Sequence, residues 1–114
     1  MKTEIEKGIG FRVVETIGYG PNSIESRILM KKVTGTVSIF SVELGITLPE
    51  RTSPFDTLIQ VIDGAAEVMI ETQRTRVEVG QAIIIPAHAR NSITANVRFK
   101  MISTIIKSGY EEVA

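Results

Sequence analysis

The sequence contains no cysteine and only one histidine among its 114 residues. The absence of cysteine excludes disulfides, thiolate nucleophiles, zinc ribbons and iron–sulfur clusters. A single histidine excludes every site that needs two or three imidazoles. We therefore expect no cofactor, and the chain carries no recognisable catalytic set.

An excess of charge of one sign is also missing, because 13 Lys and Arg residues balance 13 Asp and Glu residues. A neutral chain has no electrostatic reason to bind nucleic acid or anionic lipid. No apolar stretch approaches the roughly 18 residues that a spanning helix needs, and the polar start lacks the apolar segment of a signal peptide. We expect a cytoplasmic protein that binds neither nucleic acid nor membranes.

The length is sufficient for one domain, residues 1–114, and too small for two. A chain of this size buries about two-thirds of its unfolded surface, which is enough for a single core. Residues 1–10 and 108–114 lack a periodic pattern of apolar side chains. We expect both ends to lie outside the core.

Apolar and polar residues alternate along most of the chain, which is typical of half-buried strands. Asp63 and Gly64 form a dipeptide that favours a tight hairpin, and Pro86 ends a strand because proline lacks the N–H group. No window of about 11 residues keeps the apolar stripe of a helix better than it keeps a period of two. The pattern predicts an all-β antiparallel sandwich or barrel of about eight strands. The expected strands are residues 22–30, 34–44, 58–62, 66–70, 75–79, 82–85, 91–94 and 97–106.

Residues 11–17, Phe-Arg-Val-Val-Glu-Thr-Ile, have the composition of one further strand. In small β domains a strand of this kind often pairs with an edge of a second subunit, which protects the edge from uncontrolled association. We therefore expect a homodimer in which the N-terminal arm, residues 1–20, takes part.

Glycine and proline residues fall at a recognisable spacing. Gly45 and Gly64 stand at the two ends of the pattern G-x5-H-x-H-x3,4-E-x6-G. Gly80 and Pro86 begin the pattern G-x5-P-x-G-x2-H-x3-N. In these features the chain resembles the cupin family over residues 35–106. The resemblance implies a single-domain jelly-roll barrel, also called a double-stranded β-helix.

The positions at which cupins place metal ligands hold other residues here. In the first pattern, Arg51 and Ser53 take the places of two histidines and Thr57 takes that of the glutamate. In the second pattern, Asn91 takes the place of the third histidine and His88 that of a glycine. A guanidinium has no lone pair to offer, and neutral oxygens are too weak to hold iron, zinc or nickel without the help of charge. We expect no tightly bound transition metal.

The resemblance also places these side chains at the mouth of the barrel, with apolar residues such as Ile59 and Ile93 deeper inside. An arginine beside hydroxyls and an amide suits a carboxylate or a phosphate, which a guanidinium binds bidentately. The alternative is that Arg51 lies on the rim in a solvated ion pair with Glu50 or Asp56. The predicted ligand-binding residues are Arg51, Ser53, Thr57, Asn91 and His88.

His88 is the one side chain whose ordinary pKa suits proton transfer near neutral pH. Some metal-free sugar epimerases of the cupin group, which this chain resembles only loosely, use a histidine paired with an aspartate as the base. No aspartate stands at a recognisable spacing from His88, so Glu43, Glu50 or Asp56 would have to reach it in space. The alternative is an exposed histidine in a loop, where polar side chains are common.

Three hypotheses about function follow. The one we favour is a metal-free barrel that binds a small polar or anionic molecule without chemistry of its own. The second is an isomerase, epimerase or lyase in which His88 acts as the acid and base and Arg51 stabilises a developing enolate. The third is a structural dimer whose barrel is filled by its own Met and Ile side chains.

Overall fold

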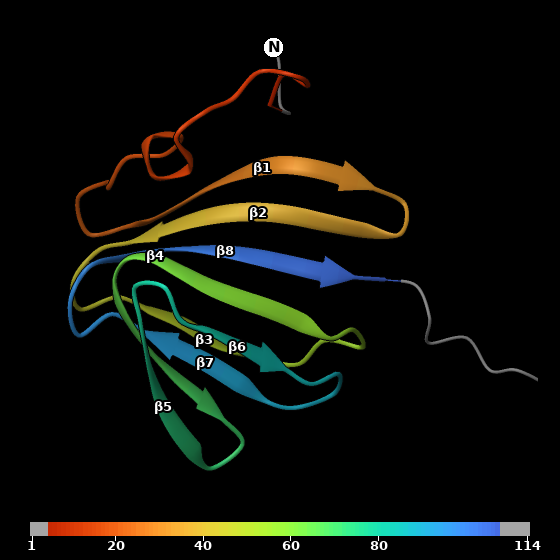
Figure 1. Ribbon diagram of the computed structural model, residues 1–114. Coiled ribbons are helices and arrows are strands. Elements are labelled where there is room, and N and C mark those ends of the chain that lie inside the picture. The colour runs from red at the N-terminus through yellow and green to blue at the C-terminus, as the bar shows by residue number, and fades with distance from the viewer. Residues whose placement is uncertain (1–4, 108–114) are drawn as a thin grey trace, which may run out of the picture.

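The computed structural model describes residues 5–107, and nearly all the regular secondary structure in this part of the chain is β-strand (Figure 1). It contains eight strands and one short 3-10 helix. No helix within these residues is long and apolar enough to cross a membrane. The elements in chain order are η1 (Val13–Glu15), β1 (Ile24–Lys32), β2 (Gly35–Val42), β3 (Thr47–Arg51), β4 (Thr57–Ile70), β5 (Gln73–Glu78), β6 (Ala82–Ile85), β7 (Asn91–Thr94) and β8 (Phe99–Ile106).

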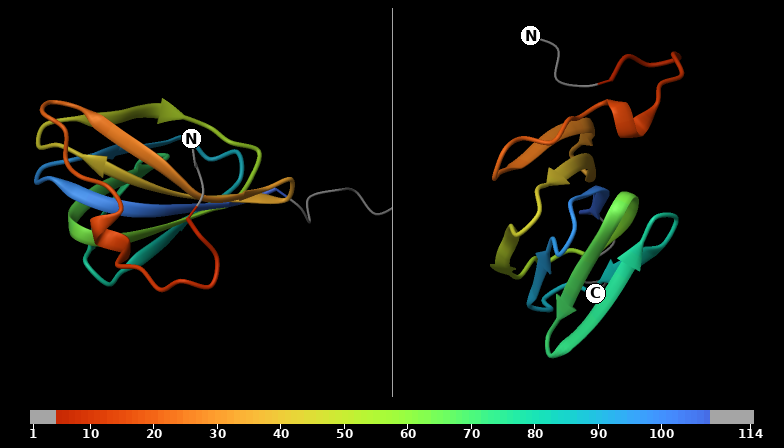
Figure 2. Two further views of the ribbon diagram at one scale, coloured as in Figure 1. Left: turned by 90° about the horizontal axis from the view of Figure 1, so that it is seen from above. Right: turned by 90° about the vertical axis from the view of Figure 1, so that its left-hand side faces the viewer.

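The strands curl into two facing sheets that are joined by the long strand β4 (Figures 1 and 2). Their hydrogen-bonded order is β1-β2-β8-β4-β7-β3, and β5 and β6 also pair with β4. Every pairing is antiparallel. The first sheet holds β1, β2, β8, β6 and residues 57–64, and the second holds β3, β5, β7 and residues 65–70. The predicted all-β class with antiparallel strands is confirmed.

The predicted hairpin at Asp63 and Gly64 is wrong, because β4 runs through this point without turning back. A bulge between Val61 and Asp63 bends the strand, and Gly64 has a φ of 69°. A Cβ at Gly64 would collide with the carbonyl oxygen of Arg98, just before β8. The dipeptide therefore supplies a bend that carries β4 from the first sheet to the second, and the segments 58–62 and 66–70 are one strand.

Residues 11–17 do not form the predicted extra strand, since Val13–Glu15 is a 3-10 helix. Side chains of the first sheet instead donate hydrogen bonds to carbonyls of the arm. Lys100 Nζ binds the oxygen of Val14 at 2.7 Å, and Ser41 Oγ binds that of Gly18 at 2.7 Å. The arm therefore crosses the outer face of the sheet. These two carbonyls accept hydrogen bonds from side chains, whereas in an extra strand they would accept them from the backbone of a neighbouring strand.

Tyr19 fixes the end of this arm. Its hydroxyl donates to Asp63 Oδ2 at 2.6 Å, and the guanidinium carbon of Arg98 lies 4.0 Å from the centre of its ring. Burial and the hydrogen bond to Asp63 raise the pKa of the Tyr19 phenol above its ordinary value. The neutral phenol and the cation over its ring therefore hold the arm against the barrel.

The core is one cluster of apolar side chains between the two sheets. Its members come from the seven strands β2 to β8 and from the loop after β7. Burial of each large side chain contributes about 1.5–3 kcal/mol. The larger members with almost no exposed surface are Val42, Ile59, Val61, Val68, Val77, Ile93, Phe99 and Met101. Ile39 is equally buried but lies outside this cluster, on the outer face beneath the arm.

The two ends of the barrel differ. At the closed end, on the left of Figure 1, Val42, Ala95 and Phe99 have no exposed surface. The loops there are joined by backbone hydrogen bonds from Gly45 N to Ala95 O at 2.8 Å and from Ala95 N to Ile46 O at 2.9 Å. At the opposite end, on the right of Figure 1 and called the open end below, β2, β4 and β7 begin and β1, β3, β6 and β8 end.

Candidate functional site

The backbone brings the five predicted site residues to the open end. In the register of the sheets, Arg51 lies opposite Asn91, and Thr57 lies opposite Ile85. Between these pairs, the backbone N–H of His88 donates to the carbonyl of Ser53 at 2.6 Å. The segments 51–57 and 85–91 therefore lie side by side along the rim, although about thirty residues separate them in sequence.

The five side chains differ in their burial. Thr57 and Asn91 are buried, with 7% and 5% of their surface exposed, and Ser53 is half-buried. Arg51 and His88 are exposed. The site therefore has two buried polar residues on the inner wall and a cation and an imidazole on the rim.

Asn91 holds the rim together. Its Nδ2 donates to the carbonyl of Arg51 at 3.2 Å and to that of Ala89 at 3.3 Å. The amide nitrogen thus ties the end of β3 to the loop before β7, and its donors are used by the backbone. The amide oxygen is the part of this side chain left to accept a hydrogen bond from another group.

His88 has a φ of 70°, which is the left-handed conformation. This explains why the cupin pattern has a glycine at this position, since glycine adopts that conformation without steric cost. The neighbouring Ala87 N donates to Asp56 Oδ1 at 2.8 Å, so the fold brings Asp56 to this loop. Glu71 also lies at the loop, since its Oε1 accepts from Arg90 N at 3.1 Å. Glu43 instead binds Arg98 at 2.9 Å near the closed end and is not a partner for His88.

Sequence reasoning missed the hydroxyl groups on the inner wall of the first sheet. Ser38 lies opposite Ser103, which is 4% exposed, and Thr36 and Thr57 both lie opposite Ile105. Cross-strand partners share a face, so these side chains face the barrel interior with Thr57. The available signal was the parity of Thr36 and Ser38, which is that of the buried Val42 on the same strand.

The Thr36 hydroxyl is the one buried side-chain oxygen or nitrogen without a hydrogen-bond partner within residues 5–107. A buried polar group that lacks a partner costs about 1–3 kcal/mol. Such a group in a folded protein calls for an explanation.

The cupin resemblance implies a metal site at this end, and the side chains do not fit one. Within the described part of the chain no three residues of His, Cys, Asp or Glu gather closely enough to hold a metal ion. The ligand positions hold a cation, two hydroxyls and an amide whose nitrogen binds the backbone. Neutral oxygens are weak ligands for first-row transition metals, and the arginine adds repulsion.

Comparison with known proteins identifies the fold. No protein-family model and no curated protein matches the chain. A conserved protein of unknown function from Streptococcus pyogenes has 25% sequence identity and a TM-score of 0.86 over 92% of each chain. A cupin superfamily protein from Desulfitobacterium hafniense has 22% identity and a TM-score of 0.85, covering 94% of this chain and 97% of its own. A cupin 2 conserved barrel domain protein from Leptotrichia buccalis has 26% identity and a TM-score of 0.82, covering 85% of this chain and 47% of its own.

The chain therefore has the cupin fold, and the resemblance found in the glycine and proline spacing is confirmed. These structures include a protein of unknown function and proteins described only by their fold. The comparison thus identifies a cupin-like barrel, and the choice of ligand depends on the side chains described above.

Proposed function

We propose that this cupin-fold barrel binds a small polar or anionic molecule at its open end, without a metal ion. The observation that carries the proposal is the convergence of Arg51, Asn91 and Thr57 at one end of the barrel. Ser103 and Thr57 are buried on the same inner wall, so a ligand that reaches Thr36 meets several hydroxyl groups. A site with an apolar floor and a few convergent polar groups is the usual form of a small-molecule site.

Arg51 contributes the positive charge of this site. It lies at the end of β3, directly across the ladder from the buried Asn91. Its exposed side chain keeps the charge at the rim, where a carboxylate or phosphate is able to stay partly hydrated. The proposed ligand therefore has an anionic group for the rim and a polar, uncharged part for the hydroxyl wall.

Calorimetric titration with malonate and with inorganic phosphate tests this proposal. We expect saturable binding to the unmodified chain and a loss of affinity of about tenfold or more for Arg51→Gln, because a charge-assisted hydrogen bond is lost. Arg90→Gln is the matched control, since Arg90 is another exposed arginine of the rim and already pairs with Glu71 at 3.6 Å. Equal binding by the unmodified chain and Arg51→Gln would refute the role of Arg51.

A separate observation favours dimerisation, through a different surface from the expected edge strand. One cross-strand row on the outer face of the first sheet is uncharged from β1 to β6. Met30 and Ile84 at its two ends are 48% and 63% exposed. The three residues between them are half-buried, and exposed apolar side chains on an uncharged surface are typical of an interaction site. The row consists of Met30, Val37, Thr104, Leu58 and Ile84.

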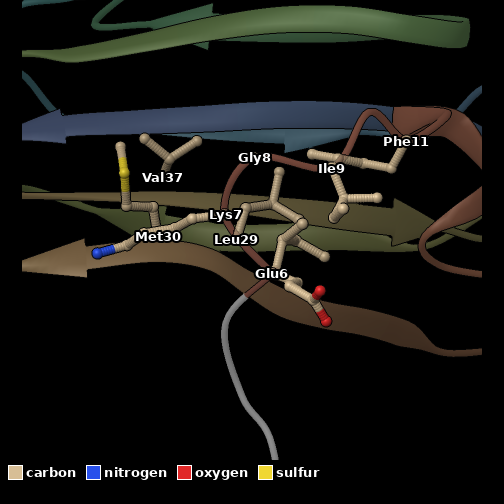
Figure 3. Close-up of a pocket in the computed structure, with 9 residues that line it drawn as sticks. Glu6, Lys7, Gly8, Ile9, Phe11, Leu29, Met30 and Val37 are labelled. Atoms are coloured by element: carbon tan, nitrogen blue, oxygen red, sulfur yellow. The ribbon is translucent and has the colours of Figure 1, made fainter.

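We propose that this row contacts the same row of a second copy. An uncharged row is complementary to itself, which a two-fold interface requires, and the chain has no net charge to oppose pairing. Beside the row, the arm and β1 enclose an apolar hollow of about 390 Å³ (Figure 3). Met30 and Val37 line both the row and the hollow, and Ile9 and Phe11 of the arm cover its other side. The hollow thus extends the apolar surface toward the arm.

Sedimentation equilibrium measures this association. We expect a mass of twice the 12.5 kDa of one chain, and a monomer for Ile84→Lys, because a charge would then be buried twice in a symmetric interface. Val33→Lys is the control, since Val33 is 95% exposed in the turn after β1. A monomer at every concentration of the unmodified chain would refute the dimer.

A further inference from the structure

A polar groove lies on the outer face of the second sheet, away from the barrel interior. Its volume is about 280 Å³, near the small end of ligand sites. Strands β4, β5 and β7 and the start of the loop after β7 contribute to it. The lining residues are Glu67, Met69, Arg74, Ser92, Thr94 and Asn96.

The alternation of the strands sets these side chains apart from the open end. On β7, Asn91 and Ile93 are buried, whereas Ser92 and Thr94 point to the opposite face. Met69 lies opposite Ser92 on one side and Arg74 on the other. The long side chain of Arg74, the flexible one of Met69 and the short one of Ser92 therefore follow one another across the sheet. The short Ser92 leaves the space that forms the groove.

The groove contains one positive charge without a partner. Glu67 accepts a hydrogen bond from Arg76 at 3.0 Å, and Arg76 also pairs with Glu78 at 3.2 Å. Arg74 makes no ion pair with any residue that the structure describes. An anion in the groove is therefore attracted by Arg74, while the negative charge of Glu67 is offset by its neighbour.

The remaining lining groups suit a polyhydroxylated molecule. Thr94 and Thr47 share a hydrogen bond of 3.1 Å between their hydroxyls, which leaves further hydrogen-bonding capacity on Thr94. Ser92 and Asn96 add a hydroxyl and an amide, each able to donate and to accept. Met69 offers an apolar, adaptable surface for the C–H groups of such a molecule.

We propose that this groove binds a small polyhydroxylated anion, of the class of sugar acids, with its carboxylate on Arg74. The hydroxyls of the ligand contact Ser92, Thr94 and Asn96, and its carbon chain lies against Met69. This second site is independent of the open end, because different faces of β7 form the two sites.

Amide chemical shifts of the full chain during titration with gluconate test the proposal, with inorganic phosphate and sorbitol as comparison probes. We expect saturable shifts at residues 92–96 and near Arg74 with gluconate. We expect weaker responses to phosphate, which lacks the hydroxylated carbon chain, and to sorbitol, which lacks the carboxylate. Arg74→Gln is expected to lower the gluconate affinity about tenfold, and Ser92→Ala by a smaller factor. Arg51→Gln, at the open end, is expected to leave the groove shifts unchanged.

Several outcomes would overturn this inference. The first is the absence of shifts at residues 92–96 with all three probes. The second is an unchanged gluconate affinity in Arg74→Gln. The third is a groove response to phosphate as strong as that to gluconate, which would remove the polyhydroxylated class. A gluconate affinity that depends on Arg51 alone would place the anion at the open end, refute the groove and leave the proposed function intact.

Discussion

The closed and open ends of the barrel are built from the same strands but from different side chains. Val42, Ala95 and Phe99 fill the closed end completely, and backbone hydrogen bonds join its loops. The open end has hydroxyls and an amide on its inner wall and an arginine on its rim. Apolar side chains therefore close one end, whereas the other end carries buried polar groups that must find hydrogen-bond partners.

The largest effect that separates the two ends is expected from Phe99→Ala. Truncation of a fully buried phenylalanine costs about 3–5 kcal/mol in the free energy of unfolding, which urea denaturation measures. Ile105→Ala is the open-end counterpart, and we expect a smaller loss because Ile105 is half-buried beside Thr36 and Thr57. Equal losses for the two variants would mean that side chains fill both ends alike, as the structural-dimer hypothesis requires.

Gly64→Ala is expected to follow, with a loss of about 3 kcal/mol or failure to fold, because its Cβ would meet the carbonyl of Arg98. Gly80→Ala is the control. Gly80 has a φ of 87°, but a Cβ added there would meet no atom within 4 Å. We therefore expect only the cost of holding an alanine in the left-handed conformation, about 1–2 kcal/mol in the free energy of unfolding. Similar losses of unfolding free energy in both variants would show that close packing at the bend of β4 contributes little.

Thr36→Val is expected to stabilise the unliganded protein by about 1 kcal/mol, because it replaces a buried hydroxyl that lacks a partner. Thermal or urea unfolding measures this gain, and Thr75→Val on the exposed strand β5 is the control with little expected change. The same Thr36→Val variant is expected to bind malonate more weakly. Destabilisation together with unchanged binding would show that the hydroxyl has another role.

His88→Gly is expected to have the smallest effect, a gain of about 0.5–1 kcal/mol, because glycine relieves the left-handed conformation at φ 70°. His88→Ala removes the imidazole but keeps the Cβ, so it is expected to leave the free energy of unfolding nearly unchanged. A loss of stability in His88→Gly that His88→Ala shares would mean that the imidazole itself makes a stabilising contact.

The sequence contained most of the information on the strands. Alternation predicted Asn91–Thr94 to the residue, and it placed β1, β2 and β8 within two residues at either end. It missed Thr47–Arg51 as a separate strand, because Leu48 is the one buried side chain in that edge strand. The hairpin at Asp63 was wrong because a glycine with positive φ serves a tight turn and a bend equally well.

The candidate site was harder to predict. The cupin resemblance implied that Arg51, Ser53, Thr57, His88 and Asn91 lie at one end, and the register of the sheets agrees with that grouping. The hydroxyls on β2 and β8 were not found, since their role depends on the pairing of strands far apart in sequence. Which side chains are buried depends likewise on tertiary packing, so sequence left the exposure of Arg51 open.

A crystal structure of the protein grown with malonate would test the central proposal most directly. The account predicts density for one malonate ion at the open end, with an oxygen within hydrogen-bonding distance of the Thr36 hydroxyl and a carboxylate near Arg51. Density for the ion only at other positions, with none near Arg51, would contradict it.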